Sequence, residues 1–218
     1  MLVLLDLDGT LTDPYEGITK CVAHALDSLG QPRLEERALR SFIGPPLQDQ
    51  FASLGLDEGG VARAVELYRE RFRDQGLYEN CVYEGVPDAL QALAAVPLRL
   101  GVATSKPTPF AERILRHFGL DEHLDLVAGA TLDGRRRMKA DIISFALTAL
   151  DVDAADAVMV GDRAQDVDGA RAVGMSSIGV TWGYAEPGEL EAAGADQIVA
   201  TPDALVGVLL ERHRMRHE

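Results

Sequence analysis

The sequence predicts an α/β protein in which a parallel sheet with flanking helices carries a small helical insertion. Residues 2–5, Leu-Val-Leu-Leu, form a short and fully apolar run of the kind that makes a buried parallel strand. From about residue 82 onward, short apolar runs alternate with helical stretches, which is typical of parallel strands joined by helical crossovers. Residues 14 to about 80 show helical periodicity and contain no convincing strand.

Two carboxylates stand where the first predicted strand ends, in the sequence Asp6-Leu7-Asp8-Gly9-Thr10. Ligands of open α/β sheets bind beyond the carboxyl ends of the strands, so we expect Asp6 and Asp8 to face a crevice. If the chain is still extended there, the two side chains share one face. A cation or a shared proton must then relieve their repulsion. The alternative for these five residues alone is a polar strand end followed by a Gly-Thr turn.

The inserted segment is predicted to form a series of helices. Helical periodicity covers residues 15–29, 34–42, 47–54 and 57–75, and the breakers between them are Gly30, Gly44-Pro45-Pro46 and Gly55. A proline at position 45 or 46 suits the first turn of the third helix. We expect the chain to leave the sheet near residues 12–14 and to return near residues 83–86. The predicted core therefore comprises residues 1–13 and 82–218, and the predicted helical cap comprises residues 14–81.

The rest of the core is predicted to alternate strands with helices. Further strands are expected at residues 98–103, 124–128, 157–160, 177–181 and 197–200. Helices are expected at residues 110–118, 139–150, 163–173 and 202–213, and Gly119 closes the first of these.

A second polar group follows the predicted strand at residues 98–103, in the sequence Thr104-Ser105-Lys106-Pro107. Hydroxyl groups and free backbone N–H groups at a strand-to-helix turn are good donors to a phosphoryl oxygen. Helix capping by Thr104 or Ser105 is the alternative, because both residue types cap helices routinely.

A third polar group, in the sequence Gly161-Asp162-Arg163-Ala164-Gln165-Asp166, follows the predicted strand at residues 157–160. Asp162 lies at the strand end, and Asp166 falls four residues later on the same face of the opening helix. Carboxylates placed in this way suit a hard cation such as Mg²⁺. Asp162 as a helix N-cap, with Asp166 in the first turn, explains the pattern equally well.

Lysine is scarce in this chain and therefore informative. Three of the 21 basic residues are lysines, namely Lys20, Lys106 and Lys139. Where the composition leans so far toward arginine, a lysine hints that a compact ammonium group is needed. Lys139 opens the helix predicted at residues 139–150. A solvated surface lysine is the alternative for each of the three.

Composition and charge exclude several classes of function. The chain has 218 residues, of which 47% are apolar and 26% are charged, as in a protein with a sizeable buried core. A net charge of −14 disfavours nucleic-acid binding and requires any phosphate site to supply its own positive charge. No segment approaches the length of a membrane span, and no signal peptide is visible, so no membrane partner is expected. Cys21 and Cys81 match no metal-ligand spacing and are expected to be buried free thiols of a reducing, cytoplasmic compartment.

Taken together, the first three polar groups and Lys139 look like the four motifs of the haloacid dehalogenase superfamily. The chain resembles most closely the phosphoglycolate-phosphatase-like branch, which has a helical cap between the first and second motifs. The resemblance covers essentially the whole chain. It implies a Rossmann-like, doubly wound parallel sheet under a mobile cap, and Mg²⁺-dependent phosphoryl transfer to an aspartate.

The resemblance also implies a role for each motif residue. By position, Asp6 resembles the nucleophile and Asp8 the general acid and base. The metal would be held by Asp6, the backbone carbonyl of Asp8 and Asp162, with Asp166 in support. The phosphoryl group would be held by Thr104, Ser105 and Lys139.

The substrate is left open by this resemblance. The stretch Phe42-Ile43-Gly44-Pro45-Pro46-Leu47 resembles a sub-group with pyrophosphatase-like and nucleotidase-like members as well as glycolate-phosphate hydrolases. A structural turn before a helix explains the same stretch equally well. We expect a small phosphorylated metabolite, phosphoglycolate-like or a nucleotide or sugar phosphate, as the substrate of a monomer or homodimer. A sugar phosphomutase or a pyrophosphatase is the alternative. A non-enzymatic binding module is disfavoured, because every motif residue is retained.

Overall fold

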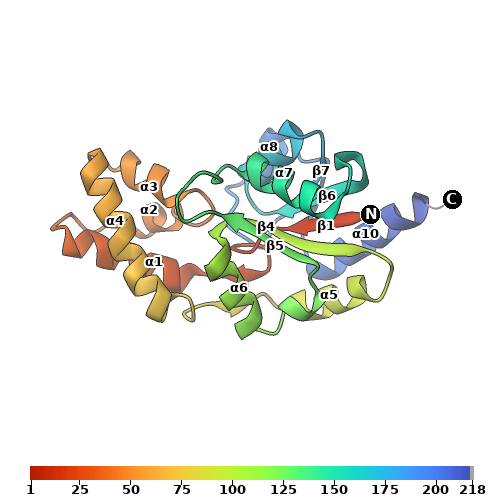
Figure 1. Cartoon of the computed structure of the whole chain (residues 1–218), viewed down its shortest axis with the longest axis horizontal. Coiled ribbons are helices and arrows are strands. Elements are labelled where there is room, and N and C mark those ends of the chain that lie inside the picture. Colours follow the sequence, from red (N-terminus) through yellow and green to blue (C-terminus); the bar gives the residue numbers. More distant parts are fainter. Residues whose placement is uncertain (217–218) are drawn as a thin grey trace.

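A parallel sheet lies between two layers of helices in the computed structural model, which describes residues 1–216 (Figure 1). Residues 217 and 218, the end of the expected core, lie outside the described residues. The six strands of this sheet have the order β5-β4-β1-β6-β7-β8, and all neighbours are parallel. They are β1 (Leu2–Leu5), β4 (Arg99–Pro107), β5 (Leu126–Ala130), β6 (Ala157–Gly161), β7 (Ser176–Val180) and β8 (Gln197–Val199). The predicted α/β fold with a doubly wound parallel sheet is confirmed.

The strand order places a crevice beside the end of β1. The chain adds β4 and β5 on one side of β1 and then β6, β7 and β8 on the other side. Such a reversal opens a crevice beyond the carboxyl ends of the strands, where ligands of these folds bind. Leu5 lies opposite Val102 of β4 and Val160 of β6, so the residues that follow these strands meet at one edge.

The alternating side chains of β1 divide the core into two layers. Val3 and Leu5 belong to the layer that contains α5 (Val86–Ala94), α6 (Thr108–His117) and α10 (Pro202–Met215). Leu2 and Leu4 belong to the layer that contains α7 (Lys139–Leu150) and α8 (Ala164–Ala172). All four β1 side chains are buried, and full burial of such a side chain stabilises the fold by about 1.5–3 kcal/mol. Burial on both faces explains why β1 is an unbroken apolar run.

A helical segment, defined as residues 15–76, extends from one end of the sheet (Figure 1). It contains α1 (Tyr15–Ser28), α2 (Glu36–Arg40), α3 (Leu47–Ser53) and α4 (Glu58–Arg71), which continues as the π-helical turn η1 (Phe72–Gly76). An antiparallel pair that the sequence did not predict, β2 (Thr12–Asp13) and β3 (Cys81–Val82), joins the segment to the sheet. The predicted helices of this segment are present, whereas its assignment as a separate cap domain of residues 14–81 stays a prediction.

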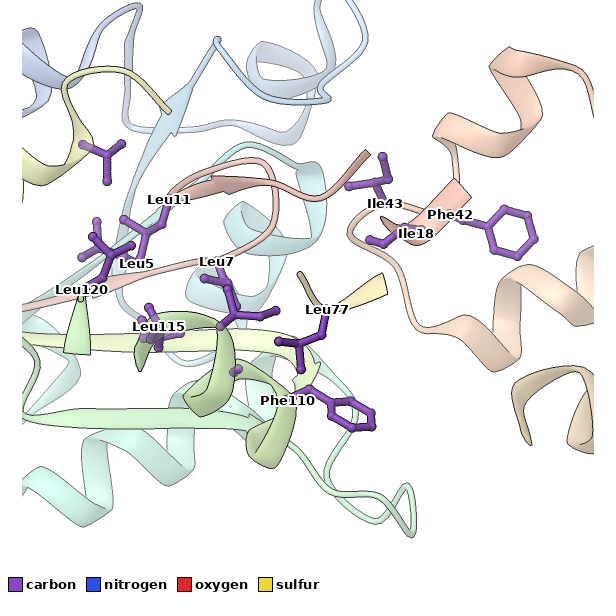
Figure 2. Packing of buried hydrophobic residues seen from close by; sticks show 14 of the residues in the cluster. Leu5, Leu7, Leu11, Ile18, Phe42, Ile43, Leu77, Phe110, Leu115 and Leu120 are labelled. Carbon is purple, nitrogen blue, oxygen red and sulfur yellow. The ribbon is translucent and has the colours of Figure 1, made fainter. Parts of the chain in front are cut away.

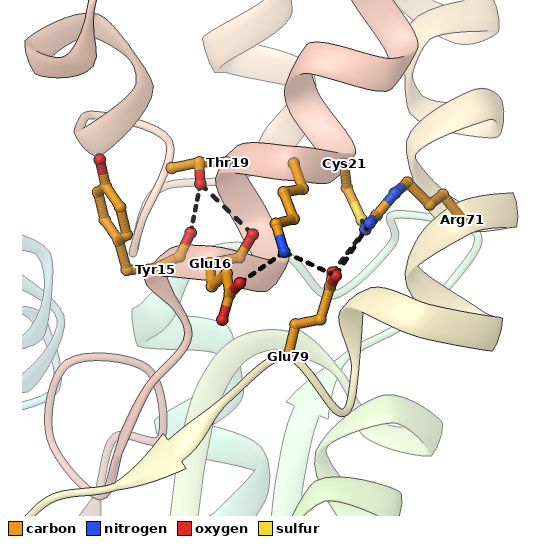
Figure 3. A network of polar contacts seen from close by, with 7 residues as sticks. Tyr15, Glu16, Thr19, Cys21, Arg71 and Glu79 are labelled. Carbon is orange, nitrogen blue, oxygen red and sulfur yellow. Dashed lines mark hydrogen bonds and ion pairs between the residues drawn. The ribbon is translucent and has the colours of Figure 1, made fainter.

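A charged network centred on Glu79, just after the helical segment, joins α1 to the end of α4 (Figure 3). The ammonium group of Lys20 lies 2.5 Å from Glu16 and 3.1 Å from Glu79. Arg71 donates two hydrogen bonds to Glu79, at 2.7 and 3.1 Å, and a third to the sulfur of Cys21 at 3.2 Å. Because the Arg71–Glu79 pair is bidentate and mostly buried, it fixes the geometry of this end of the segment more firmly than a single exposed ion pair could.

The two cysteines are free but differ in exposure. Cys21 is buried as expected, and burial raises the pKa of its thiol to about 11. Cys81 is exposed, so the expectation of a buried thiol is wrong for this residue. It lies in the two-residue strand β3, whose only strand partner within residues 1–216 is β2. Within residues 1–216, no helix is long and apolar enough to cross a membrane.

Several element boundaries differ from the predicted ones. β5 begins at Leu126 because the preceding residues form the 3₁₀ turn η2 (Asp121–His123), and a second such turn, η3 (Ala154–Asp156), precedes β6. α5 and the short helix α9 (Glu189–Ala193) were not predicted. β4 continues through Pro107 with a register irregularity against β5, so Thr104 to Lys106 lie within the strand rather than after it. Gly129 permits this irregularity, because a Cβ there would lie 2.4 Å from the carbonyl oxygen of Lys106.

Candidate active site

Three buried carboxylates converge at the carboxyl end of the sheet. Asp6 follows β1, Asp162 follows β6, and Asp166 lies in the first turn of α8. Each contributes a carboxyl oxygen to a cluster in which these atoms lie within 4.8 Å of one another. The structure therefore brings together the acidic residues that the sequence placed at two separate strand ends.

Glycines make room for these carboxylates. A Cβ on Gly9 would lie 2.2 Å from an oxygen of Asp162, and Gly9 adopts a φ of +87°, which favours glycine. A Cβ on Gly161 would lie 2.2 Å from the carboxyl carbon of Asp166. Side chains at either position would push the acidic groups out of the cluster.

Two buried lysines provide the positive charge of the site. The Nζ atom of Lys139 lies 3.1 Å from Oδ2 of Asp6 and 2.7 Å from Oδ1 of Asp166, and it donates to the carbonyl oxygen of Ala103 at 3.0 Å. The Nζ atom of Lys106 lies 2.6 Å from Oδ2 of Asp8. The sequence predicted the position of Lys139 in the site. It did not predict that of Lys106, although the scarcity of lysine was a signal.

The carboxylate of Asp8 lies outside the three-residue cluster and pairs with Lys106 instead. Its second oxygen, Oδ1, is buried and has no hydrogen-bond partner among residues 1–216. Burial raises the pKa of Asp8, and the charge of Lys106 offsets this effect only in part. A carboxyl group in such surroundings favours its protonated form more than an exposed one does.

The buried charges do not balance. Among the buried residues of positions 1–216 there are four carboxylates, Asp6, Asp8, Asp162 and Asp166, and two cations, Lys106 and Lys139, which leaves an excess of buried negative charge when every group is ionised. Burial, together with the charges of Asp166 and Asp6, raises the pKa of Asp162 well above its usual value. Burial raises the pKa of Asp166 to about 6 despite the nearby lysine. Burial alone would lower the pKa of Lys139, but the carboxylates of Asp166 and Asp6 raise it above its usual value.

This all-oxygen donor set fits Mg²⁺. Hard divalent cations prefer carboxylate oxygens, and a divalent cation would offset the excess negative charge of the cluster. Neutralising that excess would also reduce the cost of keeping the carboxylates ionised in a buried site.

The hydroxyl residues of β4 lie at the same edge. Thr104 is buried, and its Oγ1 accepts a hydrogen bond from the backbone N–H of Lys106 at 3.2 Å. Ser105 is half-buried and lines both of the cavities described next. Of the two predicted phosphate-binding hydroxyl residues of β4, only Ser105 lines these cavities, and Thr104 lies buried beside it.

Two cavities meet this edge where the helical segment contacts the sheet. A cavity of about 50 Å³ is lined by Asp8 and Lys106 from the sheet side and by Arg69 from the helical segment. A wider one of about 460 Å³ includes Lys139. The 42–46 loop, defined as residues 42–46 before α3, contributes Pro45 to the walls of both.

Apolar packing continues from the core into the helical segment (Figure 2). Leu7 and Phe110 of the core belong to the same buried cluster as Ile18, Phe42 and Ile43 of the helical segment. Polar contacts also cross between the two parts. Among them are those of Arg137 with Asp49 at 2.7 Å and of Arg69 with the carbonyl oxygen of Leu132 at 3.2 Å.

Comparison with known proteins identifies the family. Residues 3–180 match the family model described as haloacid dehalogenase-like hydrolase, and the chain belongs to this family. A crystal structure of a predicted phosphatase from Clostridium acetobutylicum superposes with a TM-score of 0.93 and 42% identity, covering 96% of this chain and 98% of that one.

Curated relatives carry several enzyme names. A protein of Pseudomonas aeruginosa named 5'-nucleotidase is 46% identical over 191 residues, which cover 87% of this chain and 86% of that protein. A phosphoglycolate phosphatase of Cupriavidus necator is 37% identical, with 95% and 92% covered. The tyrosine-protein kinase PtkA of Mycobacterium tuberculosis is 42% identical, and the match covers 84% of this chain and 62% of PtkA. Family and relatives together make this chain an enzyme of the phosphatase type.

Proposed function

We propose that the protein is an Mg²⁺-dependent phosphatase that hydrolyses a small phosphate monoester through an aspartyl phosphate on Asp6. The observation that carries this proposal is the position of Asp6. Its carboxylate lies at the end of β1, pairs with the ammonium group of Lys139 and also belongs to the carboxylate cluster with Asp162 and Asp166. A carboxylate nucleophile divides hydrolysis into formation and breakdown of a covalent intermediate.

In the proposed reaction, a carboxylate oxygen of Asp6 attacks phosphorus, and the bond to the leaving-group oxygen breaks. Lys139 neutralises negative charge on Asp6 and on the phosphoryl oxygens, while Thr104 and Ser105 orient the group. A bound Mg²⁺ would supply further charge neutralisation at the phosphoryl oxygens. Its proposed ligands are Asp6, the carbonyl of Asp8 and Asp162, with Asp166 in support.

Asp8 is the proposed general acid and base. Its protonated carboxyl group gives a proton to the departing oxygen, and its carboxylate then takes a proton from the water that attacks the aspartyl phosphate. Inorganic phosphate leaves and Asp6 is restored. The raised pKa and the unpartnered Oδ1 of Asp8 support this role, because both favour a proton on that group in the first step.

The leaving group is proposed to occupy the cavity of about 50 Å³, because that cavity contains Asp8. Its walls combine the cation of Arg69 with aromatic rings such as Tyr68 and Phe72. The small volume suits a compact leaving group such as glycolate, and opening of residues 14–81 as a mobile cap would admit a nucleoside or sugar. The names of the Pseudomonas and Cupriavidus relatives support a choice within this range.

A screen of phosphate esters with Mg²⁺ tests the proposal. Phosphate release should require Mg²⁺, should stop with chelator and should be abolished in Asp6→Asn while the fold is retained. The panel should include 2-phosphoglycolate, nucleoside monophosphates, sugar phosphates and pyrophosphate, with a mutase assay on hexose phosphate beside it. Turnover by Asp6→Asn, or full activity after exhaustive chelation, would contradict the mechanism. Transfer from ATP to protein rather than to water would instead favour the activity for which PtkA is named.

A further inference from the structure

Arg163 connects the carboxylate cluster to the helical segment. It follows Asp162 directly, and its backbone N–H donates to Oδ2 of Asp166 at 3.1 Å. Its guanidinium group reaches away from the cluster, and Nη1 donates to the carbonyl oxygen of Ile43 at 2.7 Å. One residue therefore bonds both to the acidic cluster and to the 42–46 loop, which lies 120 residues away in sequence.

The 42–46 loop is shaped to receive this arginine. Gly44 adopts a φ of +105°, and a Cβ there would lie 3.1 Å from Cγ of Arg163. Such a conformation strains any residue other than glycine, and the side chain would press on the arginine. Phe42 and Ile43, the two residues before Gly44, are buried, so packing holds the Ile43 carbonyl that accepts from Arg163 in place.

A third element fixes the arginine itself. Oε1 of Glu189 accepts from Nε of Arg163 at 2.9 Å and from the backbone N–H of Ala164 at 2.8 Å. Oε2 of Glu189 accepts from the backbone N–H of Glu186 at 2.9 Å. The Arg163–Glu189 pair is largely buried, with side-chain exposures of 14% and 16%. The side chains of the Arg137–Asp49 pair are 42% and 52% exposed. Because the Arg163 side chain is cationic and largely buried, its hydrogen bond to Ile43 is less screened by solvent than the half-exposed Arg137–Asp49 ion pair, which also links the sheet to the helical segment.

We infer that Arg163 is a positioning residue. It fixes the 42–46 loop over the leaving-group cavity and holds the loop in a set position relative to the carboxylate cluster. The inference rests on the proposed function for the identity of that cavity. It goes beyond that function by assigning the loop's placement to a residue with no role in the chemistry. Removing the guanidinium group should make the 42–46 loop more mobile, while Asp6, Asp162 and Asp166 are still present in the carboxylate cluster.

Hydrogen exchange of the full-length protein tests the inference without any need for activity. Arg163→Met should accelerate exchange in peptides that contain residues 42–46 by about tenfold, as expected for loss of a charge-assisted hydrogen bond. Glu189→Gln should produce a smaller change in the same peptides, because the backbone bonds to residue 189 can persist. Arg171→Met is the matched control, since Arg171 lies on α8 and donates to Ala193 of α9 but does not contact the loop.

Kinetics distinguish positioning from a general loss of structure. With the best ester of the screen, Arg163→Met should raise KM by about tenfold. It should also increase the share of phosphoryl groups transferred to added methanol rather than water, because a loose loop admits other nucleophiles. The KM of Arg163→Lys should lie between that of the wild type and that of Arg163→Met. The inference is wrong if Arg163→Met and Arg171→Met show the same hydrogen-exchange rate in the 42–46 loop and the same share of phosphoryl transfer to methanol. If the wild type releases no phosphate from any ester but loop exchange responds as expected, only the proposed function fails.

Discussion

Lys139→Met tests the charge balance of the buried site. The Lys139 side chain is 4% exposed and lies between Asp6 and Asp166. Its removal leaves two buried carboxylates facing one another without a cation. Breaking a buried pair in this way costs about 3–5 kcal/mol. For a domain of this length, each kcal/mol lowers Tm by roughly 2–4 °C, so we expect a decrease of about 6–20 °C without metal.

The assay is thermal unfolding in metal-free buffer, followed by circular dichroism. Lys20→Met is the matched control, because the Lys20 side chain is 47% exposed and its ion pairs are solvated. Its Tm should change by no more than about 2 °C. The double variant Lys139→Met, Asp166→Asn should regain part of the lost stability, since it removes one of the two opposed carboxylates. Phosphate release should remain lost in both Lys139 variants.

A Lys139→Met protein that melts within the range of the Lys20→Met control would refute this reasoning. The carboxylates of Asp6 and Asp166 would then avoid repulsion by another route, such as binding a proton. In that case the double variant would show no recovery, and the excess negative charge could not be used to argue for a cation.

Three further predictions concern the acid, the loop and pH. Asp8→Asn should lower kcat for the hydrolysis of alkyl phosphates at least about tenfold more than for p-nitrophenyl phosphate, whose leaving group needs less protonation. Equal losses of kcat for the two kinds of substrate would contradict this. Leu47→Ala, at the start of α3 in the cavity wall, should reorder kcat/KM among esters, whereas an unchanged order would place specificity in the core. In metal-free protein, burial raises the pKa of Asp166 to about 6 from 3.8, so the native state binds more protons than the unfolded state between these values. The free energy of unfolding should therefore fall as pH rises from about 4 to about 6, and urea titrations with a flat profile would exclude this.

Most of the fold was predictable because its strands are buried on both faces. β1 and β6 form continuous apolar runs, whereas β7 begins with two serines, and each of the three strands lies within one residue of its predicted position. β2 and β3 were not predictable, since two-residue strands carry no periodicity and their pairing depends on distant parts of the chain. The five-residue helix α9 is too short for a helical pattern to be distinct.

For the site as well, residues placed by a local sequence pattern could be predicted, whereas contacts between distant parts of the chain could not. The positions of Asp6 and Asp162 could be predicted because parallel strands end at one edge of the sheet. The pairing of Lys106 with Asp8 depends on how β4 bends at its end, and no spacing in the sequence encodes that bend. Arg163 was similarly hidden, because its partner Ile43 lies in the inserted segment and accepts through a backbone carbonyl that is independent of side-chain type.

The geometry around Lys139 explains why this arginine-rich chain retains a lysine there. Its ammonium group has three N–H donors, and three acceptors surround it, from Asp6, Asp166 and Ala103. A guanidinium group holds its donors in one plane and could not direct them at acceptors around a single nitrogen. Space is also limited, because a Cβ on Gly169 would lie 2.7 Å from Cγ of Lys139, so α8 packs directly on the lysine stem. A compact, tetrahedral cation is therefore the group that this position can hold without displacing the acidic cluster.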